Sequence, residues 1–282
     1  MTGIQVTPEE LLAVRYDINT PSDFPVSFSP LAGNGYSGAK GSGSDLYGIR
    51  EYQQGDICKK INRQATARTG ILHLNEYVED RLLSAYILTD QSTLMFFTST
   101  HVMKSVIGAR KSAEILFYYL ENGHRASGEV FNEDAYFSLP LTNSEAICEE
   151  WIATVAEYNM SLPGKDCKGR QNSLIDALVR MLESEITGRE IYIISDFINY
   201  EVTLLQNLLT TLCSKNRIYL LQITDRLEDN PPLKQWLNDG KNEFMLNNGN
   251  ERSRYLRIRE CKRQKLIDFS KDNNIEIIEL FT

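Results

Sequence analysis

The chain has 282 residues, of which 30 are basic and 38 acidic, so its formal net charge is −8 at pH 7. This length is enough to bury a large core as one domain or two. The acidic balance excludes general binding to nucleic acid or to anionic membranes, so any such contact has to be local.

The sequence shows no targeting or membrane-spanning pattern. No apolar run approaches the ~20 residues of a membrane span, and residues 1–19 lack both the basic start and the apolar centre of a secretory leader. The five cysteines are scattered, without a CxxC pair, which is typical of reduced thiols. We therefore expect a cytoplasmic protein.

Residues 1–80 are expected to form an extension that packs onto the rest of the chain, because they hold too few apolar side chains for their own core. A helix is predicted to begin at Thr7, where Glu10 completes a capping box. Residues 21–44 are rich in Pro, Ser and Gly and predict a loop. Lys40 in this loop is followed by glycine, so the Gly-Lys-Ser/Thr sequence of a nucleotide-binding loop is absent.

Residues 41–81 mix basic, aromatic and acidic side chains. Five cations interleaved with two tyrosines would suit contact with phosphate or nucleic acid. Six acids in the same segment can pair with these cations instead, and we favour this ion-paired alternative. The five cations that we group in this patch are Arg50, Lys59, Lys60, Arg63 and Arg68.

Residues 81–282 are expected to form one α/β domain with a Rossmann-like sheet. Short apolar runs bounded by turns predict strands buried on both faces, with residues 85–88 central and 191–194 beside them. Further strands are predicted at residues 126–131, 218–223 and 275–280. Stripes of apolar residues at helical spacing lie between these runs, and this alternation predicts a parallel sheet with right-handed crossovers.

Three of the predicted strands end in an acid: Asp90, Asp196 and Asp225. The carboxyl ends of parallel strands meet at one edge of a sheet, where ligands bind in open α/β folds. Like charges so close together need a cation or protons between them. The oxygens of Asp90 and Ser92 suit a hard cation such as Mg²⁺, whereas the alternative is that both residues only cap the next segment.

Residues 48–56, GIREYQQGD, followed by ATARTG at 65–70, resemble the signature of the domain of unknown function 58 family. The resemblance implies a von Willebrand factor A-like domain, with a mostly parallel sheet flanked by helices, after the signature. Two positions depart from it: Asn62 stands where Asp is usual, and Arg63 where Trp is usual. The residues that we assign to the signature or to an interaction are Arg50, Tyr52, Gly55, Asp56, Arg68, Gly70, Asp225 and Glu228.

The same resemblance implies a partly degenerate metal-ion-dependent adhesion site. In von Willebrand factor A domains a D-x-S-x-S turn, a later Thr and an Asp at a later strand end hold the metal. Asp90 and Ser92 match the first two positions, Leu94 replaces the third, Ser173 stands for the Thr, and Asp196 is the last acid. We expect weak Mg²⁺ binding completed by water; the alternative is a site whose residues are satisfied by backbone N–H groups.

Catalysis needs a positioned base or nucleophile, and the sequence offers no clear one. His73, His101 and His124 are isolated, and no cysteine has an activating neighbour. We therefore expect a non-enzymatic protein–protein interaction module. The family resemblance implies a MoxR-type AAA+ ATPase and other von Willebrand factor A proteins as partners, in bacterial assembly, maturation or stress processes. The alternative is a Mg²⁺-dependent phosphoester hydrolase that uses Asp90 and Asp196.

A basic helix is predicted near the end of the chain. Residues 252–265 contain seven Lys or Arg against one acid, Glu260, and their apolar residues are close to helical spacing. We favour a solvated face; an acidic partner, or peripheral contact with the anionic inner membrane leaflet, stays open. Nucleic acid is disfavoured because no stacking aromatic residues are interleaved with these cations.

Overall fold

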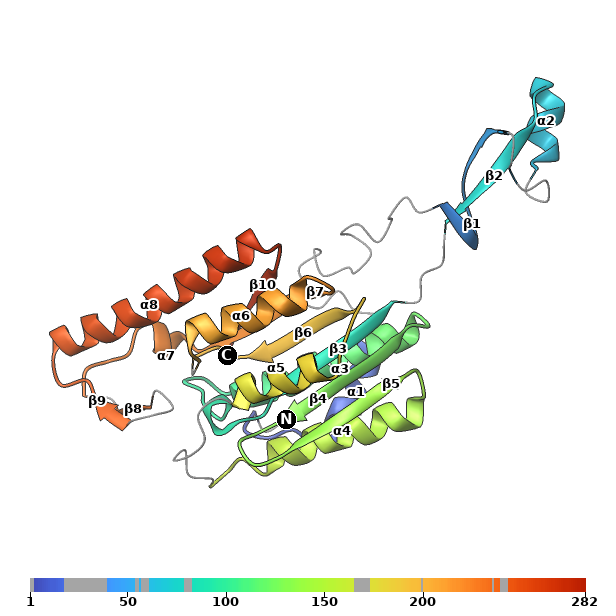
Figure 1. The fold of residues 1–282 in the computed structure, drawn as a ribbon. Coiled ribbons are helices and arrows are strands. Elements are labelled where there is room, and N and C mark those ends of the chain that lie inside the picture. Colours follow the sequence, from blue (N-terminus) through green and yellow to red (C-terminus); the bar gives the residue numbers. More distant parts are fainter. Residues whose placement is uncertain are drawn as a thin grey trace. The chain divides into compact units, whose positions relative to one another are not determined.

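The computed structural model describes residues 3–17, 40–53, 56, 61–78, 83–164, 173–198, 200–234, 236–238 and 243–282. The chain divides into two compact units: Met1–Thr20 with Leu83–Thr282, and Pro21–Leu82 (Figure 1). The larger unit contains a six-stranded sheet with its helices, and the smaller unit contains a two-stranded sheet with one helix.

In the smaller unit, β1 (Lys40–Glu51) pairs antiparallel with β2 (His73–Val78), and α2 (Arg63–Thr69) lies between them in the sequence. The loop predicted for residues 21–44 is therefore wrong from Lys40 onward, because pairing with β2 overrides the low strand propensity of glycine. The rest of that predicted loop, residues 21–39, lies outside the described residues.

The ends of α2 show what one departure from the family signature does. The side chain of Asn62 accepts a hydrogen bond from the N–H of Ala65 at 2.9 Å, so it caps the helix as an Asp would. The helix ends at Gly70, whose φ of 74° favours glycine. Arg63, the other departure, is the first residue of α2 and is exposed.

The larger unit is built on a sheet with the strand order β10-β7-β6-β3-β4-β5. All neighbours are parallel except β5, which pairs antiparallel with β4 at one edge. The strands are β3 (Ser84–Asp90), β4 (Arg125–Phe131), β5 (Tyr136–Thr142), β6 (Glu190–Ser195), β7 (Arg217–Thr224) and β10 (Glu276–Phe281). The prediction of a central strand at 85–88 with 191–194 beside it is confirmed.

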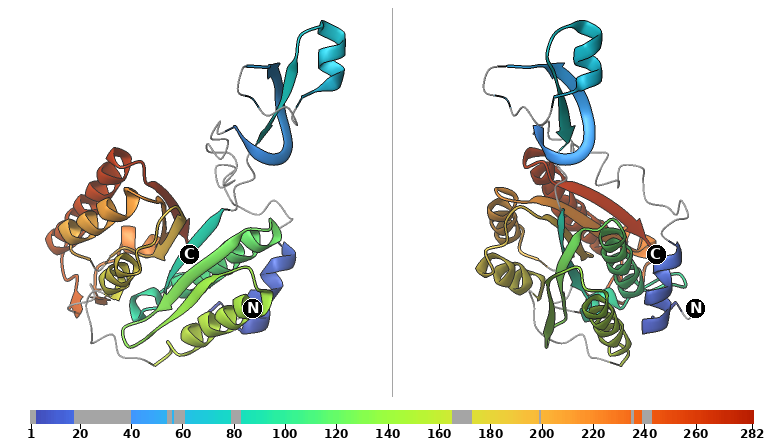
Figure 2. Two further views of the ribbon diagram at one scale, coloured as in Figure 1. Left: turned by 45° about the vertical axis from the view of Figure 1, so that its right-hand side comes forward. Right: turned by 90° about the vertical axis from the view of Figure 1, so that its right-hand side faces the viewer.

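Helices cover both faces of this sheet (Figure 2). On one face α3 (Lys104–Glu121) packs on β3, and it contacts α1 (Pro8–Asp17) and α4 (Glu145–Met160). On the other face α5 (Ser173–Glu183), α6 (Val202–Cys213) and α8 (Gly249–Asp272) follow one another, with α6 in contact with both neighbours. This is an α/β fold with a mostly parallel sheet flanked by helices, as expected.

The central strand shows why the apolar runs identified the sheet correctly. In β3 every residue after Ser84 is buried. Tyr86 and Leu88 join the cluster formed with α5 and α6, while Thr89 points to α3 and its hydroxyl lies 2.7 Å from that of Ser112. Because successive side chains alternate between two covered faces, the strand needs apolar residues throughout.

The first twenty residues belong with the larger unit, although the sequence analysis placed them in the extension 1–80. The helix α1 begins with the predicted capping box: the Glu10 N–H donates to the Thr7 hydroxyl, and the Thr7 N–H donates to the Glu10 carboxylate. The domain division 1–80 and 81–282, and the packing of residues 21–80 on the domain, stay predictions.

Three short elements complete the larger unit. The 3₁₀ helix η3 (Thr93–Met95) follows β3, and α7 (Arg226–Asp229) follows β7. A two-stranded sheet of β8 (Trp236–Asn238) and β9 (Glu243–Met245) precedes α8. Within the part of the chain that the structure describes, no helix is both long enough and apolar enough to cross a bilayer.

Candidate functional site

The three acids at the strand ends come together at one edge of the sheet. β3, β6 and β7 are adjacent and parallel, so their carboxyl ends lie side by side. Asp90 ends β3, Asp196 follows β6, and Asp225 follows β7. All three are buried, with at most 4% of each residue exposed. The three acids therefore lie at one edge of the sheet, as predicted, and their buried charges have to be neutralised there.

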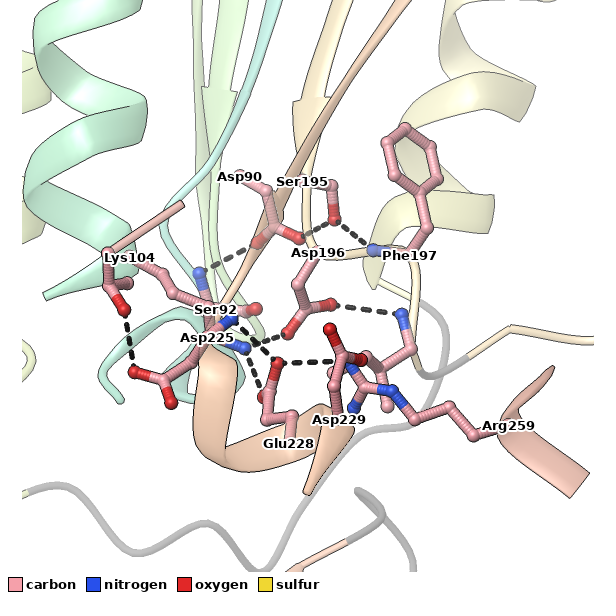
Figure 3. A network of polar contacts seen from close by, with 12 residues as sticks. Asp90, Ser92, Lys104, Ser195, Asp196, Phe197, Asp225, Glu228, Asp229 and Arg259 are labelled. Atoms are coloured by element: carbon pink, nitrogen blue, oxygen red, sulfur yellow. Dashed lines mark hydrogen bonds and ion pairs between the residues drawn. The ribbon is translucent and has the colours of Figure 1, made fainter. Parts of the chain in front are cut away.

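Asp90 is held by neutral donors. Its Oδ1 accepts from the N–H of Ser92 at 2.8 Å, and its Oδ2 accepts from the hydroxyl of Ser195 at 2.6 Å (Figure 3). Burial, followed by the charge of Asp196, raises the pKa of Asp90 to about 6, against the opposing effect of these hydrogen bonds. Asp90 therefore gains a proton just below neutral pH.

Asp196 is held by a cation from within the chain. Lys104, the first residue of α3, is 1% exposed, and its Nζ donates to the Asp196 carboxylate at 2.7 Å and to Glu228 at 2.8 Å. Burial lowers the pKa of Lys104, but the two carboxylates outweigh burial and leave that pKa above its ordinary value. Lys104 is therefore a fully charged ammonium at neutral pH.

The helix α7 brings Glu228 into this network. Asp225 caps α7 by accepting from the Leu227 N–H at 2.7 Å, and the Glu228 side chain accepts from the Asp225 N–H at 3.2 Å, which completes a capping box. The same oxygen of Glu228, Oε2, also accepts from Arg259 of α8 at 3.2 Å. Arg259 also pairs with the partly exposed Asp229 at 3.4 Å.

Asp225 fastens the loop after β3 and the end of the chain to the same edge. Its Oδ2 accepts from the Ser99 N–H and from the Thr282 hydroxyl, each at 2.6 Å. Burial raises the pKa of Asp225, but these two hydrogen bonds and the one from Leu227 lower it by a larger amount. The pKa of Asp225 therefore lies below its ordinary value. Asp225 and Glu228, which we assigned to a signature or interaction role, are thus internal tethers.

The donor set does not fit a resident divalent cation. Both oxygens of Asp90 are engaged, the third position of the turn is Leu94, and the ammonium of Lys104 lies against Asp196. A divalent ion beside that ammonium would meet a like charge instead of a ligand. In the described ranges, no group of three or more His, Cys, Asp or Glu side chains is placed to hold a metal ion.

The remaining predicted ligand is Ser173. Ser173 is the first residue of α5, and the hydrogen bonds found for Asp90 and Asp196 do not include it. Thr93, next to Leu94, bonds through its N–H and its hydroxyl to Glu133, at 2.7 and 2.6 Å. The turn after β3 is therefore fixed to the end of β4 by protein groups.

A groove opens beside this edge, with a volume of about 920 Å³. It is bounded by the segment after β6, the start of α6, the ends of β7 and β9, and one side of α8. Its apolar and aromatic wall includes Phe197, Tyr200, Val202, Leu246, Tyr255 and Ile258; its cations are Arg254, Arg259, Lys262 and Arg263, and its acids are Glu201, Asp229 and Glu251. Arg259 connects the groove to the buried network through Glu228.

The backbone at the entrance of the groove is held in an unusual conformation. Phe197, directly after Asp196, has a φ of 52°, which is uncommon for a residue other than glycine. The Asp196 carboxylate accepts from the Ile198 N–H at 3.1 Å and so stabilises this turn. Strained positions of this kind cluster at binding sites and switches, which is one reason to place the functional surface here.

The signature residues of the smaller unit have local structural roles. Arg50 donates to Asp56 through two bonds of 2.7 Å, so the ion-paired alternative is confirmed for this pair. The Tyr52 N–H donates to the Leu72 carbonyl at 2.8 Å, and Arg68 is exposed in the last turn of α2. Gly55 lies outside the described residues.

Sequence reasoning missed Lys104, Ser195 and Arg259 as members of the site. Ser195 had a signal, because it precedes the acid that follows β6. Arg259 was noted only as one charge of a basic helix. Lys104 carries no local signal, since its two partners are 92 and 124 residues away in the chain.

Comparison with known proteins gives a family. The sequence profile of the family described as "Protein of unknown function DUF58" matches residues 48–264, which is most of the chain. Uncharacterized proteins of Mycobacterium tuberculosis and Mycobacterium bovis are 27% identical over 158 residues, 56% of this chain and 48% of each relative. The chain thus spans about half the length of the curated relatives it matches.

Two solved structures are also similar. An aerotolerance-related membrane protein from Bacteroides fragilis is 19% identical with a TM-score of 0.37, over 70% of this chain and 91% of that chain. The SpRpn10 VWA domain is 10% identical with a TM-score of 0.35, over 71% of this chain and 89% of that chain.

Proposed function

Since this chain belongs to the DUF58 family, we propose that it is a non-enzymatic protein-interaction module whose partner is a MoxR-type AAA+ ATPase. The observation that carries the proposal is the groove between α8 and the carboxyl edge of the sheet. It combines an apolar wall with cations of α8, and it lies where open α/β folds bind their ligands.

Four cations and three acids line the groove, so its charged lining has a small positive excess. The helix α8 has eight Lys or Arg and four Asp or Glu, in a chain whose net charge is −8. Ile258, which lines the groove, is 52% exposed, and the exposed Arg254 lies one turn before it. The occupant that matches this surface is an amphipathic segment of the ATPase with carboxylates beside apolar side chains.

The state of the acidic edge favours binding over catalysis. A phosphoester hydrolase using Asp90 and Asp196 needs carboxylates that are open to a metal and to water. Here Asp90 is bonded to Ser92 and Ser195, and Asp196 is paired with Lys104. We therefore assign these acids to the framework that fixes the groove, in place of a degenerate adhesion site that acts directly on the partner.

This proposal also sets where the protein acts. A partner that hydrolyses ATP works in the cytoplasm, so we place this module there, in bacterial assembly, maturation or stress processes. Peripheral contact of α8 with the inner membrane leaflet competes for the same cations. Other von Willebrand factor A proteins are the second class of partner that the family suggests.

The test compares two charge reversals on one helix. Arg254→Glu places an acid in the groove, whereas Arg257→Glu changes an exposed residue of α8 that does not line it. Binding of the purified MoxR-type ATPase from the same organism is measured by calorimetry at low and high salt. Arg254→Glu is expected to weaken binding about tenfold at low salt, and Arg257→Glu to change it less than about twofold.

Two results contradict the proposal. One is equal binding by the wild type and both variants, and the other is binding lost to the same extent in both. Hydrolysis of a generic phosphoester is measured in parallel with Mg²⁺ present. Turnover that disappears in Asp196→Asn would instead support the hydrolase.

A further inference from the structure

Lys104 is the least expected residue of the acidic edge. Its side chain is 1% exposed, although an ammonium is among the groups that proteins bury least often. It is tolerated because two carboxylates, Asp196 and Glu228, lie within 2.8 Å and restore the interactions that water would provide. The Phe97 ring, whose centre is 5.7 Å from Nζ, covers the ammonium from another side.

The position of this ammonium matters more than its burial. Lys104 reaches from the start of α3 to Asp196 and Glu228 (Figure 3). Asp196 directly follows β6, and Glu228 belongs to α7, the short helix after β7. One positive charge thus joins three elements that converge on the edge, which is what a bound cation does in a metal site.

The other residues of the edge satisfy the carboxylates without a metal ion, as expected if an ammonium is its cation. Leu94 supplies no ligand, and the oxygens of Asp90 accept hydrogen bonds from Ser92 and Ser195, which are neutral donors. Hydrogen bonds of this kind satisfy a carboxylate without a metal. A divalent ion would have to displace Lys104 from a pocket that the ammonium fills.

We infer that the Lys104 ammonium is the permanent cation of this edge and replaces the divalent ion, so that the module is stable and competent without metal. This inference concerns the framework and does not depend on the proposed partner. It replaces the weak Mg²⁺ binding that the turn with Asp90 and Ser92 led us to expect.

The experiment asks whether removing Lys104 creates a metal site. Lys104→Ala leaves Asp196 and Glu228 facing a space from which a long side chain is gone, and a hydrated Mg²⁺ ion can enter it. Thermal unfolding is followed with Mg²⁺, with Mn²⁺, and with a chelator. The control is Lys111→Ala, which removes another lysine of α3 that pairs with Glu114.

For the wild type, and likewise for Lys111→Ala, the unfolding temperature is expected to be the same with metal as with the chelator. Lys104→Ala is expected to be less stable and to gain about 2–4 °C in millimolar Mg²⁺ or Mn²⁺. Adding Asp196→Asn to Lys104→Ala should abolish this gain, because the carboxylate that would bind the metal in place of the ammonium is lost.

Two outcomes overturn the inference. The first is a metal-dependent rise in the wild type that disappears in Asp196→Asn, and the second is a folded Lys104→Ala variant that does not respond to either ion. If Lys104→Ala does not fold in any buffer, binding of Mn²⁺ to the wild type, followed by electron paramagnetic resonance, decides alone. No bound Mn²⁺ supports the permanent ammonium, and stoichiometric binding that is lost in Asp196→Asn refutes it.

Discussion

Asp90 gives the sharpest prediction, because its environment fixes both the sign and the size of a pH effect. Asp90→Asn keeps the shape of the side chain and an oxygen for the Ser92 N–H. The new amide can donate to the Ser195 hydroxyl, which is able to accept as well as donate. The variant therefore removes a titrating group from the buried edge with little change in packing.

The size of the effect follows from the pKa of this carboxyl. It is about 6 in the folded protein, against an ordinary value of 3.8. Since one pKa unit corresponds to 1.36 kcal/mol, the folded state holds this proton more tightly than the unfolded chain by roughly 3 kcal/mol. A raised carboxyl pKa contributes stability below about pH 3.8, and this contribution is lost as the pH rises through about 6.

The assay is urea unfolding of the wild type and of Asp90→Asn from about pH 4 to about pH 8. Only the difference between the two free energies of unfolding is interpreted, because carboxylates far from Asp90 titrate equally in both proteins. Between those limits the variant is expected to gain roughly 2.5 kcal/mol relative to the wild type, because part of the effect already develops below about pH 4. A flat difference, or a relative gain by the wild type as the pH rises, would refute the reasoning.

Asp225→Asn is the control of opposite sign. The pKa of Asp225 is lowered by its hydrogen bonds to Ser99, Thr282 and Leu227, so its charge stabilises the folded state at neutral pH. This stability is present above the unfolded pKa and is lost as the pH falls through the folded one. Asp225→Asn should therefore be destabilising at pH 7, and least so in acid.

The other predictions concern packing and a second buried charge. In Gly128→Ala the new Cβ would lie 2.4 Å from the Ile87 carbonyl oxygen, so thermal unfolding should show a loss of about 1–3 kcal/mol. Gly108→Ala is the control, since its Cβ meets side chains no closer than 3.4 Å and should be neutral or stabilising by up to about 1 kcal/mol; equal losses would contradict the packing argument. Arg180→Met removes the guanidinium from Glu129, which is 2% exposed, and should cost roughly 3 kcal/mol at pH 7 in urea unfolding. A cost below about 1 kcal/mol, the size expected for an exposed ion pair, would contradict this argument.

The sheet was largely predictable because its central strands are buried on both faces. Such strands read as short continuous apolar runs, and the acids that end them mark the carboxyl edge. β5 was missed because most of its residues are exposed, so its sequence YFSLPLT shows no continuous buried run. It belongs to the sheet through antiparallel pairing with β4, a contact that no local pattern encodes.

The site was predictable only in its acids. Asp90 and Asp196 were identifiable from their place after two strands, and Leu94 from its place in the turn. What neutralises the acids was not identifiable, because Lys104 precedes a helix stripe and resembles any exposed residue of a first turn. Its role depends on the folded chain bringing together partners that are 92 and 124 residues away.

The pH dependence caused by Asp90 also tests whether a divalent ion binds at this edge of the sheet. Lys104 pairs with Asp196 and Glu228, and Arg259 pairs with Glu228. Asp90 is bonded to neutral groups instead, and its pKa is about 6. A divalent ion at this edge would favour the charged form of Asp90 and lower its pKa. The difference in unfolding free energy between the wild type and Asp90→Asn should therefore be the same with Mg²⁺ and with a chelator. If Mg²⁺ reverses the sign of that pH dependence, the edge holds a metal and Lys104 is not its permanent cation.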